Sequence, residues 1–555
     1  MNRVYRHIRS KALGRVIVVP ECARGGGSKG GRRRRSMAGL VVPALLLAAV
    51  PGGAALADTR WTGAVDNDWF NPANWTNGVP TGSGTGETQI VPTGATPAVI
   101  DGSAASAEKY TYIGSDRGGA NGPGELRVIN GGTLNAGDCC IYLGTGGGHL
   151  GAMTVDGAGS AVSANIFVVG HYSGTGQLVI QNGGSVTGNS LMIGRYGGGI
   201  GTATVTGTNS ILSGGSWPGL ILGGESSGST SSAQGTLNLL DGGAARAGTG
   251  NRAIVVGNSY GSTGVLNIGN GGAPGIVYAS SVSFGNGNGT LNFNHNDASY
   301  SFATPITGNG TVNILAGNTI FGATNSHSGE TRVQGGELKA GVSGAFSSNS
   351  TFVVNGGTLD LDNIDQTVGG LSGTGGTVSL GTAALTVNQA GDTSYAGVIS
   401  GTGGLTKSGA GALELTGANT YSGGTTISGG TLVGNTTSLQ GNIANDAALV
   451  FDQAADGTYS GALSGTGSFT KQGVGALTLT GTNTNSGGTV VDGGELKAGV
   501  SGAFSSSSAF VVNSGTLNFN DLDHSIAGLS GTGGTVSMGT AALSIHQAGD
   551  TSYAG

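Results

Sequence analysis

Short stretches of alternating apolar and polar residues recur from about residue 110 to 295. Met153–Gly157, Leu178–Gln181 and Leu266–Ile268 each place apolar side chains two positions apart. Because successive side chains of a strand point to opposite faces, this alternation predicts short β-strands with one buried face. Many apolar runs end in Gly, at Ile113-Gly114, Leu143-Gly144, Val169-Gly170, Ile193-Gly194, Leu222-Gly223, Val256-Gly257 and Phe284-Gly285. These markers are 30, 26, 24, 29, 34 and 28 residues apart, which predicts a repeated unit of variable length.

Turns are expected where Asn or Asp precedes two glycines, because these residue types tolerate left-handed backbone geometry. Such tripeptides begin at Asn130, Asn182, Asp241, Asn270 and Asn355. A period of 24 to 34 residues holds about three short strands, which is one rung of a parallel β-helix. We therefore predict an all-β chain, a right-handed parallel β-helix (solenoid) of stacked Gly-rich strand-turn repeats. Antiparallel hairpins at the Asn-Gly turns, in a propeller or in serial sandwiches, are the alternative.

The second half of the chain contains a long duplication. Residues 335–397 recur at 493–555, which is 158 positions later, with about three quarters of the positions identical. A unit of this kind cannot bury its apolar face alone, so neighbouring units must stack. Apolar residues two apart, expected to point into the stack, are Leu413, Leu415, Leu477 and Leu479.

Composition supports ordered β-structure. The 555 residues include 116 Gly, only 9% are charged and 37% are hydrophobic. Glycine lacks the every-third spacing of collagen, and disordered chains usually carry more charge and less apolar surface. Up to Ala57 there are 11 Lys and Arg against one acid; the remainder has 12 basic and 28 acidic residues, a net charge of −16. An acidic body of this kind argues against nucleic acid as a partner.

The start of the chain has the three parts of a secretory signal. The basic block Arg32–Arg35 is followed by the apolar run Ala38–Val50 and by the cleavage motif Ala55-Leu-Ala57. The apolar run is shorter than the roughly 20 residues that span a bilayer. We predict export and cleavage after Ala57; a retained membrane anchor is the alternative.

The residues ahead of the basic block resemble a known export signal. Residues 2–14 and 18–25 are similar to the extended signal peptide region of type V secretion proteins, which reads roughly N-K-x-Y-R-x-I-x-N-x-x-x-G and then V-V-x-S-E-x-A-R-G. Here Arg3 replaces Lys, Ser10 replaces Asn and Pro20 replaces Ser. The resemblance implies a large adhesin or autotransporter of a double-membraned bacterium. Its implied partners are the inner-membrane secretion machinery and the outer-membrane barrel assembly machinery.

A second resemblance covers the repeats. Residues 401–432 are similar to the autotransporter-associated β-strand repeat, L-x-K-x-G-x-G-x-L-x-L-x-G-x-N-x-Y-x-G-x-T-x-I-x-x-G-x-L. A second copy spans 469–496, with Asn485 where Tyr421 stands, and a worn copy spans about 317–338. The resemblance implies a passenger domain whose repeats help it to fold outside the cell.

These features predict four segments. Residues 1–57 are the cleaved extended signal peptide, and 58–109 are an N-terminal cap with the first strands. Residues 110–300 are irregular β-helix rungs, and 301–555 are the repeats with their 158-residue duplication, ending before any β-barrel. The rings of Trp61, Trp69, Phe70 and Trp75 are expected to cap the first rung, which otherwise exposes unpaired backbone. A carbohydrate-stacking platform is their alternative role.

A search for catalytic chemistry is negative. The chain has no H-E-x-x-H, G-x-S-x-G, P-loop or EF-hand pattern, so we assign no catalytic, cofactor-binding or metal-binding residue. Asp360, Asp362 and Asp365 alternate near a turn and could bind a cation. Solvated acids are the favoured interpretation, because the counterparts Asn518, Asn520 and Asp523 keep only one carboxylate.

The cysteines are Cys22 in the signal and the adjacent pair Cys139-Cys140. A structural crosslink within the pair is not expected, because it would close a strained eight-membered ring. With period-two geometry, one cysteine would face inward and the other outward. Metal binding by the pair with His149 is an alternative that three ligands support weakly.

These observations predict a non-enzymatic passenger, exported to the bacterial cell surface, outer membrane or extracellular space, that acts as an adhesin or structural spacer. Candidate partners are ligands on host or neighbouring cell surfaces. The repeats are expected to support folding and translocation. Two alternatives stay open: a β-helix enzyme such as a polysaccharide lyase or hydrolase, and a passive self-associating stalk.

Overall fold

The computed structural model describes residues 6–9, 16–19, 58–82, 86–91, 96–115, 122–225, 230–248 and 252–555. The chain divides into two units, Met1–Ala54 and Ala55–Gly555. In the first unit, strands β1 (Arg6–Arg9) and β2 (Val16–Val19) pair in antiparallel fashion. The predicted basic block and apolar run, residues 32–50, and Ala57 at the predicted cleavage site lie outside the described residues.

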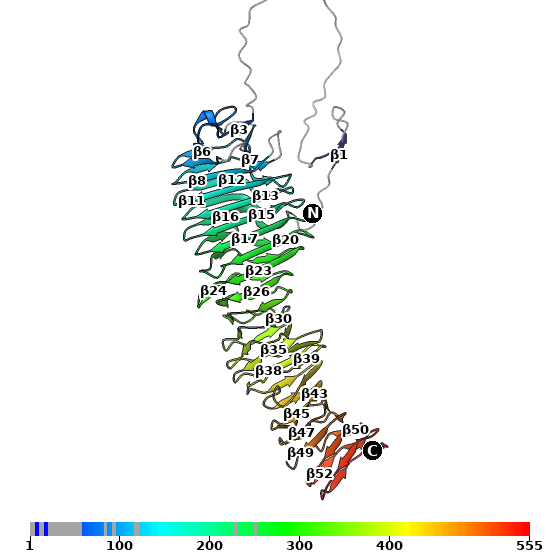
Figure 1. Ribbon diagram of the computed structural model, residues 1–555. Helices are drawn as coiled ribbons and strands as arrows, with labels where there is room; N and C mark the ends of the chain where they lie inside the picture. Colours follow the sequence, from blue (N-terminus) through cyan, green and yellow to red (C-terminus); the bar gives the residue numbers. More distant parts are fainter. Residues whose placement is uncertain are drawn as a thin grey trace, which may run out of the picture. The chain divides into compact units, whose positions relative to one another are not determined.

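The second unit is a stack of parallel strands (Figure 1). Each strand pairs in parallel with strands of the rungs before and after it, so the predicted all-β parallel β-helix is confirmed; its right-handed winding stays a prediction. The helical element among the described residues is the short 3₁₀ helix η1 (Pro72–Asn74). Within that part of the chain, no helix is long and apolar enough to span a membrane.

Two large sheets form most of the first rungs. The first has 14 strands and follows the path β3 (Thr59–Trp61), β4 (Glu87–Ile90), β7 (Tyr110–Ser115), β10 (Cys140–Thr145), β12 (Ala161–His171), β14 (Ser185–Arg195), β16 (Ile211–Leu222), β19 (Ile254–Val256), β22 (Val282–Phe284) and β25 (Ile306–Thr307). The strands β12 and β16 also pair, through their first residues, with a side strip of β6 (Ala104–Ser106), β9 (Thr133–Asn135), β18 (Ala244–Arg246) and β21 (Ile276–Tyr278). The second sheet has 12 strands: β5 (Ala98–Asp101), β8 (Gly124–Ile129), β11 (Leu150–Asp156), β13 (Thr175–Gln181), β15 (Ile200–Thr206), β17 (Gln234–Leu240), β20 (Thr263–Ile268), β23 (Asn288–Asn294), β26 (Thr311–Ala316), β28 (Thr331–Val333), β30 (Thr351–Val354) and β33 (Gly370–Ser372).

Smaller parallel sheets form the later rungs. One contains β24 (Tyr300–Phe302), β27 (Asn318–Phe321), β29 (Glu337–Ala340), β31 (Thr358–Asp360), β34 (Thr377–Ser379) and β37 (Val398–Ser400). Another contains β32 (Gln366–Val368), β35 (Leu385–Asn388), β38 (Leu405–Ser408), β40 (Thr425–Ile427), β42 (Ile443–Asn445) and β45 (Leu463–Ser464). An eight-stranded sheet contains β36 (Thr393–Tyr395), β39 (Ala412–Leu415), β41 (Thr431–Gly434), β43 (Ala448–Asp452), β46 (Ser468–Gln472), β48 (Thr489–Val491), β50 (Ala509–Val512) and β53 (Gly528–Ser530). The last two contain β44 (Gly457–Tyr459), β47 (Ala476–Leu479), β49 (Glu495–Ala498), β51 (Thr516–Asn518) and β54 (Thr535–Ser537), and β52 (His524–Ile526) with β55 (Leu543–Ile545).

The core is built from inward side chains that stack in register. The apolar residues that mark the strand ends in the sequence pair directly with one another from rung to rung and are all buried; they are Ile113, Leu143, Val169, Ile193, Leu222, Val256 and Phe284. The leucines expected inside the later rungs, Leu413, Leu415, Leu477 and Leu479, are buried too. Stacking like on like removes apolar surface from water on both neighbours at once.

The glycine after each marker has a steric cause. Gly144 adopts φ +65°, and a Cβ atom there would lie 2.0 Å from the carbonyl oxygen of Thr175. The predicted turns also need left-handed geometry, which Asn130, Asn182 and Asp241 supply themselves with φ of 53°, 54° and 49°. At the two remaining turns the left-handed residue is a glycine of the tripeptide, at Gly271 and Gly357.

An asparagine ladder runs along the outer face of the 12-stranded sheet. In each pair, the side-chain amide of one asparagine donates to the side-chain oxygen of the asparagine one rung earlier. The distances are 2.7 Å from Asn267 to Asn238, 2.8 Å from Asn292 to Asn267 and 2.8 Å from Asn313 to Asn292. These residues alternate with buried apolar residues, so one strand supplies both the core and the ladder.

The repeats bury polar groups as well as leucines. Lys407 is fully buried, and its Nζ donates to the carbonyl oxygens of Ser408, Gly409 and Gly429 at 2.8, 3.0 and 3.1 Å. Lys471 makes the same three contacts in the next copy, at 2.8 to 3.0 Å. Burial lowers the pKa of both ammonium groups, and the three carbonyl oxygens replace water around each.

The 158-residue duplication is repeated in its hydrogen bonds. Asn363 accepts from the backbone N–H of Thr382 at 3.0 Å, and its counterpart Asp521 accepts from Thr540 at 2.7 Å. Asn363 and Asp521 are both left-handed, with φ of 62° and 60°. Asn and Asp can interchange here because either side chain supplies the oxygen that accepts the bond.

Candidate functional site

The acidic residues considered as a cation site are held by other partners. The Nζ atom of Lys339 lies 2.8 Å from Asp362 and 3.6 Å from Asp360. Asp365 accepts a hydrogen bond from the backbone N–H of Ala384 at 2.8 Å. Among the described residues, no group of three His, Cys, Asp or Glu side chains is arranged to hold a metal ion.

The cysteine pair differs from expectation. Cys139 and Cys140 are joined by a disulfide, so the expectation that adjacent cysteines would not crosslink was wrong. The pair sits where the chain enters β10, and Cys140 is buried while Cys139 is half-buried. Sulfur atoms engaged in a disulfide are not thiolate ligands, which removes the metal alternative with His149.

The tryptophans near residue 70 pack rather than display their faces. Trp61, Trp69 and Trp75 are buried, and Trp75 meets the other two edge-on at 5.1 and 4.7 Å. The indole N–H of Trp75 donates to the carbonyl oxygen of Trp69 at 2.8 Å. Phe70 keeps 36% of its surface exposed. The three buried rings therefore offer no platform on which a sugar could stack.

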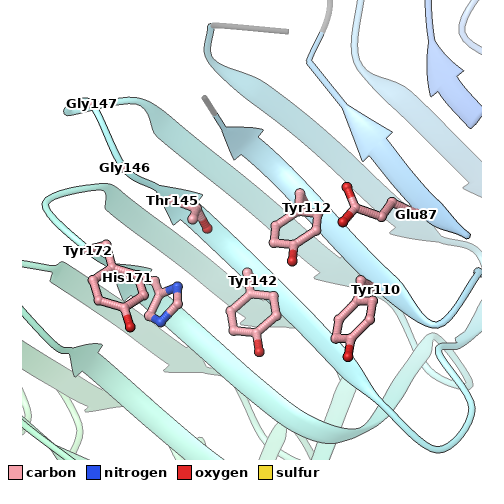
Figure 2. A pocket seen from close by; sticks show the side chains of 9 residues that line it. All are labelled: Glu87, Tyr110, Tyr112, Tyr142, Thr145, Gly146, Gly147, His171 and Tyr172. Carbon is pink, nitrogen blue, oxygen red and sulfur yellow. The ribbon is translucent and has the colours of Figure 1, made fainter. Parts of the chain in front are cut away.

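A different aromatic surface lies on the outer side of the 14-stranded sheet. A groove of about 660 Å³ opens there across β4, β7, β10 and β12 (Figure 2). We call it the tyrosine groove; its lining residues are Glu87, Tyr110, Tyr112, Tyr142, Thr145, Gly146, Gly147, His171 and Tyr172. None of these residues was singled out from the sequence.

Strand register builds the aromatic row of this groove. Tyr112 on β7 pairs directly with Tyr142 on β10, and their rings stack with centroids 5.3 Å apart and planes 12° from parallel. Neighbouring strands are about 4.8 Å apart, so aromatic residues at one register position stack almost automatically. The imidazole of His171 continues the row, 4.9 Å from the Tyr142 ring. In Figure 2 the hydroxyl groups of the tyrosines point to the same side.

The alternation of each strand decides which residues reach the groove. The neighbours of Tyr142 on β10, Ile141 and Leu143, point into the core, so Tyr142 points out. The Tyr142 side chain packs against a small apolar cluster on this outer side, formed by Val168, Met192 and Ile221. This packing holds the ring in place, because the cluster would be exposed if Tyr142 swung away.

A corner of the rung contributes the exposed end of the groove. Tyr172 follows β12 in the left-handed conformation, with φ of 45°, and 53% of its surface is exposed. It stacks on Tyr196, which occupies the same corner one rung later with φ of 52°. The guanidinium of Arg195 lies 4.6 Å from the Tyr196 ring centroid and is paired with Glu225 at 2.5 Å. The turn thus lifts a tyrosine above the sheet.

The groove combines aromatic rings with hydrogen-bonding side chains. Glu87, Tyr110, Tyr142 and Tyr172 keep part of their surface exposed and offer hydrogen-bonding groups beside aromatic rings, whereas Tyr112, Thr145 and His171 are buried. Glu87 itself accepts a hydrogen bond from the side-chain amide of Gln89 at 3.0 Å. Side chains of this kind suit a hydroxyl-rich ligand such as a sugar chain.

Sequence signals for the groove exist but are weak. The tripeptides Gly170-His171-Tyr172 and Gly194-Arg195-Tyr196 lie 24 residues apart, at one position of consecutive rungs. Tyr110 and Tyr112 share a strand and therefore a face. Whether Tyr142 lies beside Tyr112 depends on the lengths of the loops between rungs. Those lengths vary, so the contact cannot be predicted from the sequence.

Family models match two parts of the chain. The Extended Signal Peptide of Type V secretion system matches residues 1–50. The Passenger-associated-transport-repeat matches residues 316–340, 405–433 and 469–498. These are the segments in which the sequence resembled an export signal and three repeat copies, including the worn one. The matches indicate export to the cell surface or outer membrane.

Curated relatives match the body of the chain. It is 31% identical over 323 residues to the Adhesin BmaC autotransporter of Brucella suis biovar 1 (strain 1330), a match that covers 50% of this chain and 9% of that protein. It is 28% identical over 273 residues to the uncharacterized protein YuaQ of Escherichia coli (strain K12), covering 46% of this chain and 18% of that protein. The uncharacterized lipoprotein YdeK of the same strain is 35% identical over 221 residues, covering 36% and 16%. The chain thus spans less than a fifth of the length of each of these relatives.

An export signal of this kind, three transport repeats and a parallel β-helix body are the parts of one architecture. The chain thus combines an export signal and repeats that match those of type V secretion proteins with a body similar to part of an autotransporter adhesin.

Proposed function

We propose that this passenger is a non-enzymatic surface adhesin and that the tyrosine groove contacts its ligand on host or neighbouring cells. The observation that carries the proposal is the groove itself, an outward aromatic row with hydrogen-bonding groups beside it. It lies on rungs ahead of the three transport repeats, in the part of the chain where the spacing between rungs varies. A relative of this body carries the name adhesin, which supports the same function.

The repeats serve a different purpose in this proposal. Their polar groups are turned inward and hydrogen-bonded, as at Lys407 and Lys471, which favours a structural role. Regular rungs that template the next rung would help the passenger to fold after it has crossed the outer membrane. The inner-membrane secretion machinery and the outer-membrane barrel assembly machinery are the partners proposed for that export.

A matched pair of tyrosine variants tests the adhesin. Tyr172 lines the groove and is 53% exposed, whereas Tyr260 is 54% exposed and lies outside the groove lining. Beads coated with the full chain are counted on epithelial monolayers and on lawns of bacteria. We expect coated beads to adhere at least several-fold better than bare beads. Tyr172→Ser should abolish most of this difference, and Tyr260→Ser should leave it unchanged.

The remaining outcomes separate the alternatives. Equal loss in both variants would show that the groove is not the contact site. Equal retention of coated and bare beads would contradict an adhesin and favour a spacer. Release of new reducing ends from plant, bacterial or host polysaccharides by the full chain would overturn the non-enzymatic assignment in favour of a β-helix lyase or hydrolase.

A further inference from the structure

A second outward site lies on later rungs than the tyrosine groove and has a different chemistry. A pocket of about 380 Å³ is lined by residues of β18 and β21, by residues that follow these two strands and by Arg252 just before β19. Its lining residues are Arg246, Gly248, Arg252, Val277, Tyr278, Ala279 and Ser280. Two arginines in one small pocket stand out in a body that has 12 basic residues against 28 acidic ones.

Several other cations of the described chain have their charge paired with a carboxylate or surrounded by carbonyl oxygens. Three other arginines are paired with a glutamate, in Arg127–Glu125, Arg195–Glu225 and Arg332–Glu330 at 2.5 to 2.6 Å. Lys407 and Lys471 are surrounded by carbonyl oxygens. Within the described part of the chain, Arg246 and Arg252 have no carboxylate partner. Their positive charge is therefore available to an anion that enters the pocket.

Backbone pairing places Arg246 beside Tyr278 and Arg252 beside Ser280. Arg246 on β18 pairs directly with Tyr278 on β21, and its guanidinium lies 4.9 Å from the ring centroid. The backbone N–H of Ala247 donates to the carbonyl oxygen of Tyr278 at 3.0 Å. The backbone N–H of Ser280 donates to the carbonyl oxygen of Arg252 at 2.9 Å. The pocket is therefore formed by ladder bonds rather than by side chains alone.

The tyrosine offers surface beyond what Arg246 covers. Tyr278 keeps 46% of its surface exposed. Among the described strands, β21 pairs with β18 and with no strand on its other side. Val277, the residue before it, packs against the core and fixes the strand beneath the ring. An aromatic ring, two guanidinium groups and the Ser280 hydroxyl thus face one volume.

We propose that this pocket binds an acidic sugar unit, one that carries a carboxylate or a sulfate group. The guanidinium groups of Arg246 and Arg252 would take the anion, because their planar forks match carboxylate and sulfate oxygens. The Tyr278 ring would contact the apolar face of the sugar, and Ser280 would take a hydroxyl. A volume of about 380 Å³ lies within the roughly 300–1,000 Å³ range of small-ligand sites. This site is separate from the tyrosine groove and does not depend on the adhesin proposal.

Charge strengthens the assignment. The net charge of −16 over the body repels anions in general, so retention of an acidic sugar needs local positive groups. Binding through the exposed Arg246 and the half-buried Arg252 should weaken as salt screens them, since the Debye length falls from about 10 Å at 0.1 M toward about 3 Å at 1 M. A sugar held by ring contact alone would not show this dependence.

The test measures binding of the full chain to defined glycans. The probes are oligogalacturonate and sialyllactose as carboxylate sources, a chondroitin sulfate oligosaccharide as the sulfate source, and neutral cello-oligosaccharide and lactose. We expect at least one acidic probe to bind at least tenfold more tightly than its neutral counterpart. Arg246→Gln and Arg252→Gln should each weaken that binding about tenfold or more, and 0.5 M NaCl should weaken it further.

Matched variants guard against general effects. Arg127→Gln removes an exposed arginine that is paired with Glu125, and it should change the affinity less than twofold. Arg246→Lys keeps the charge but not the fork and should lie between the wild type and Arg246→Gln. Tyr172→Ser in the groove should leave binding of the acidic probe unchanged, so failure of the adhesin proposal and failure of this one give different results.

Several outcomes would overturn the proposal. They are equal binding of acidic and neutral probes, an equal effect of Arg127→Gln, and binding of inorganic sulfate alone with no gain from the sugar. Tighter binding of anionic phospholipid vesicles or of a phosphopeptide than of every acidic glycan would also contradict it. Circular dichroism that matches the wild type is required of each variant before its affinity is interpreted.

Discussion

At the scale of single residues, one repeat position shows how a buried polar group can be exchanged. Tyr421 is buried and its hydroxyl lies 2.8 Å from the hydroxyl of Thr425. In the worn copy the same place is taken by His327, whose Nε2 lies 2.8 Å from the hydroxyl of Thr331. Burial lowers the pKa of His327 from 6.5 to about 4, because the charged imidazole would lose its hydration. A tyrosine at this position does not change its protonation near neutral pH, so it adds no pH dependence to the stability.

We therefore expect His327 to make the passenger acid-sensitive. Between pH 6.5 and about 4, His327 is protonated in the unfolded chain but neutral in the folded chain. Stability must then fall as the pH drops through this window, by about 3 kcal/mol from this residue. His327→Tyr, which installs the residue of the intact copy, should flatten this fall in urea unfolding measured from pH 7 to 4. An exchange at the exposed His546, His546→Tyr, should leave the slope as it is; an equal flattening there would contradict the assignment.

At the scale of strands and rungs, the invariant part of the repeat is an asparagine that links three rungs. Asn419 accepts from the backbone N–H of Ile399 at 2.8 Å and donates to the carbonyl oxygen of Ser438 at 2.7 Å. Asn325 and Asn483 make the same pair of bonds in the other two copies. An amide is suited to this place because it carries a donor and an acceptor on one short side chain.

Truncating this link should destabilise the rungs it joins. Asn419→Ala leaves a buried N–H and a buried C=O without partners, at a cost of about 3 kcal/mol. Urea unfolding should show the loss, and hydrogen exchange should show faster exchange at the Ile399 amide. Asn442→Ala removes an exposed asparagine that accepts from the Ala462 N–H at 2.9 Å, and it should cost about 1 kcal/mol or less. Similar losses in both variants would show that burial of the link is unimportant.

At the scale of the whole molecule, stacking makes the rung the unit of stability. The strands β42, β43 and β44 form one rung, and each pairs with a strand that begins or continues 20 residues later. Each rung contacts its neighbours above and below, so stability should add up rung by rung. We therefore expect the fold to tolerate deletion of a complete rung but not deletion of part of a rung.

Deletion of one rung tests this additivity. Removal of residues 443–462 takes out all three strands, and the flanking rungs can then pair directly. We expect an unchanged β-type circular dichroism spectrum and resistance to protease. Removal of residues 453–462 takes out only β44 and leaves one side of the stack with a missing strand. That variant should be cut by protease near the deletion; equal resistance of the two variants would argue against rung-wise stacking.

The sequence by itself determined the class of fold and the export route. Alternation such as that of Leu266–Ile268 involves residues two positions apart, so it can be recognised without knowing which strands are its neighbours in the sheet. The glycines after the strand ends and the repeated Asn-Gly turns are also local requirements. The export signal and the repeats were recognisable because they are continuous motifs, and the family models match the same segments.

The tertiary structure decided which residues share a surface. Tyr112 and Tyr142 are 30 residues apart and Arg246 and Tyr278 are 32 apart, yet each pair is in direct register. Register between rungs depends on loop lengths that vary, so neither the tyrosine groove nor the arginine pocket could be read from one strand. The sequence prediction that Cys139 and Cys140 would not form a disulfide was wrong. Local alternation tells which side chains point out, and only the stacking of distant strands tells which of them meet.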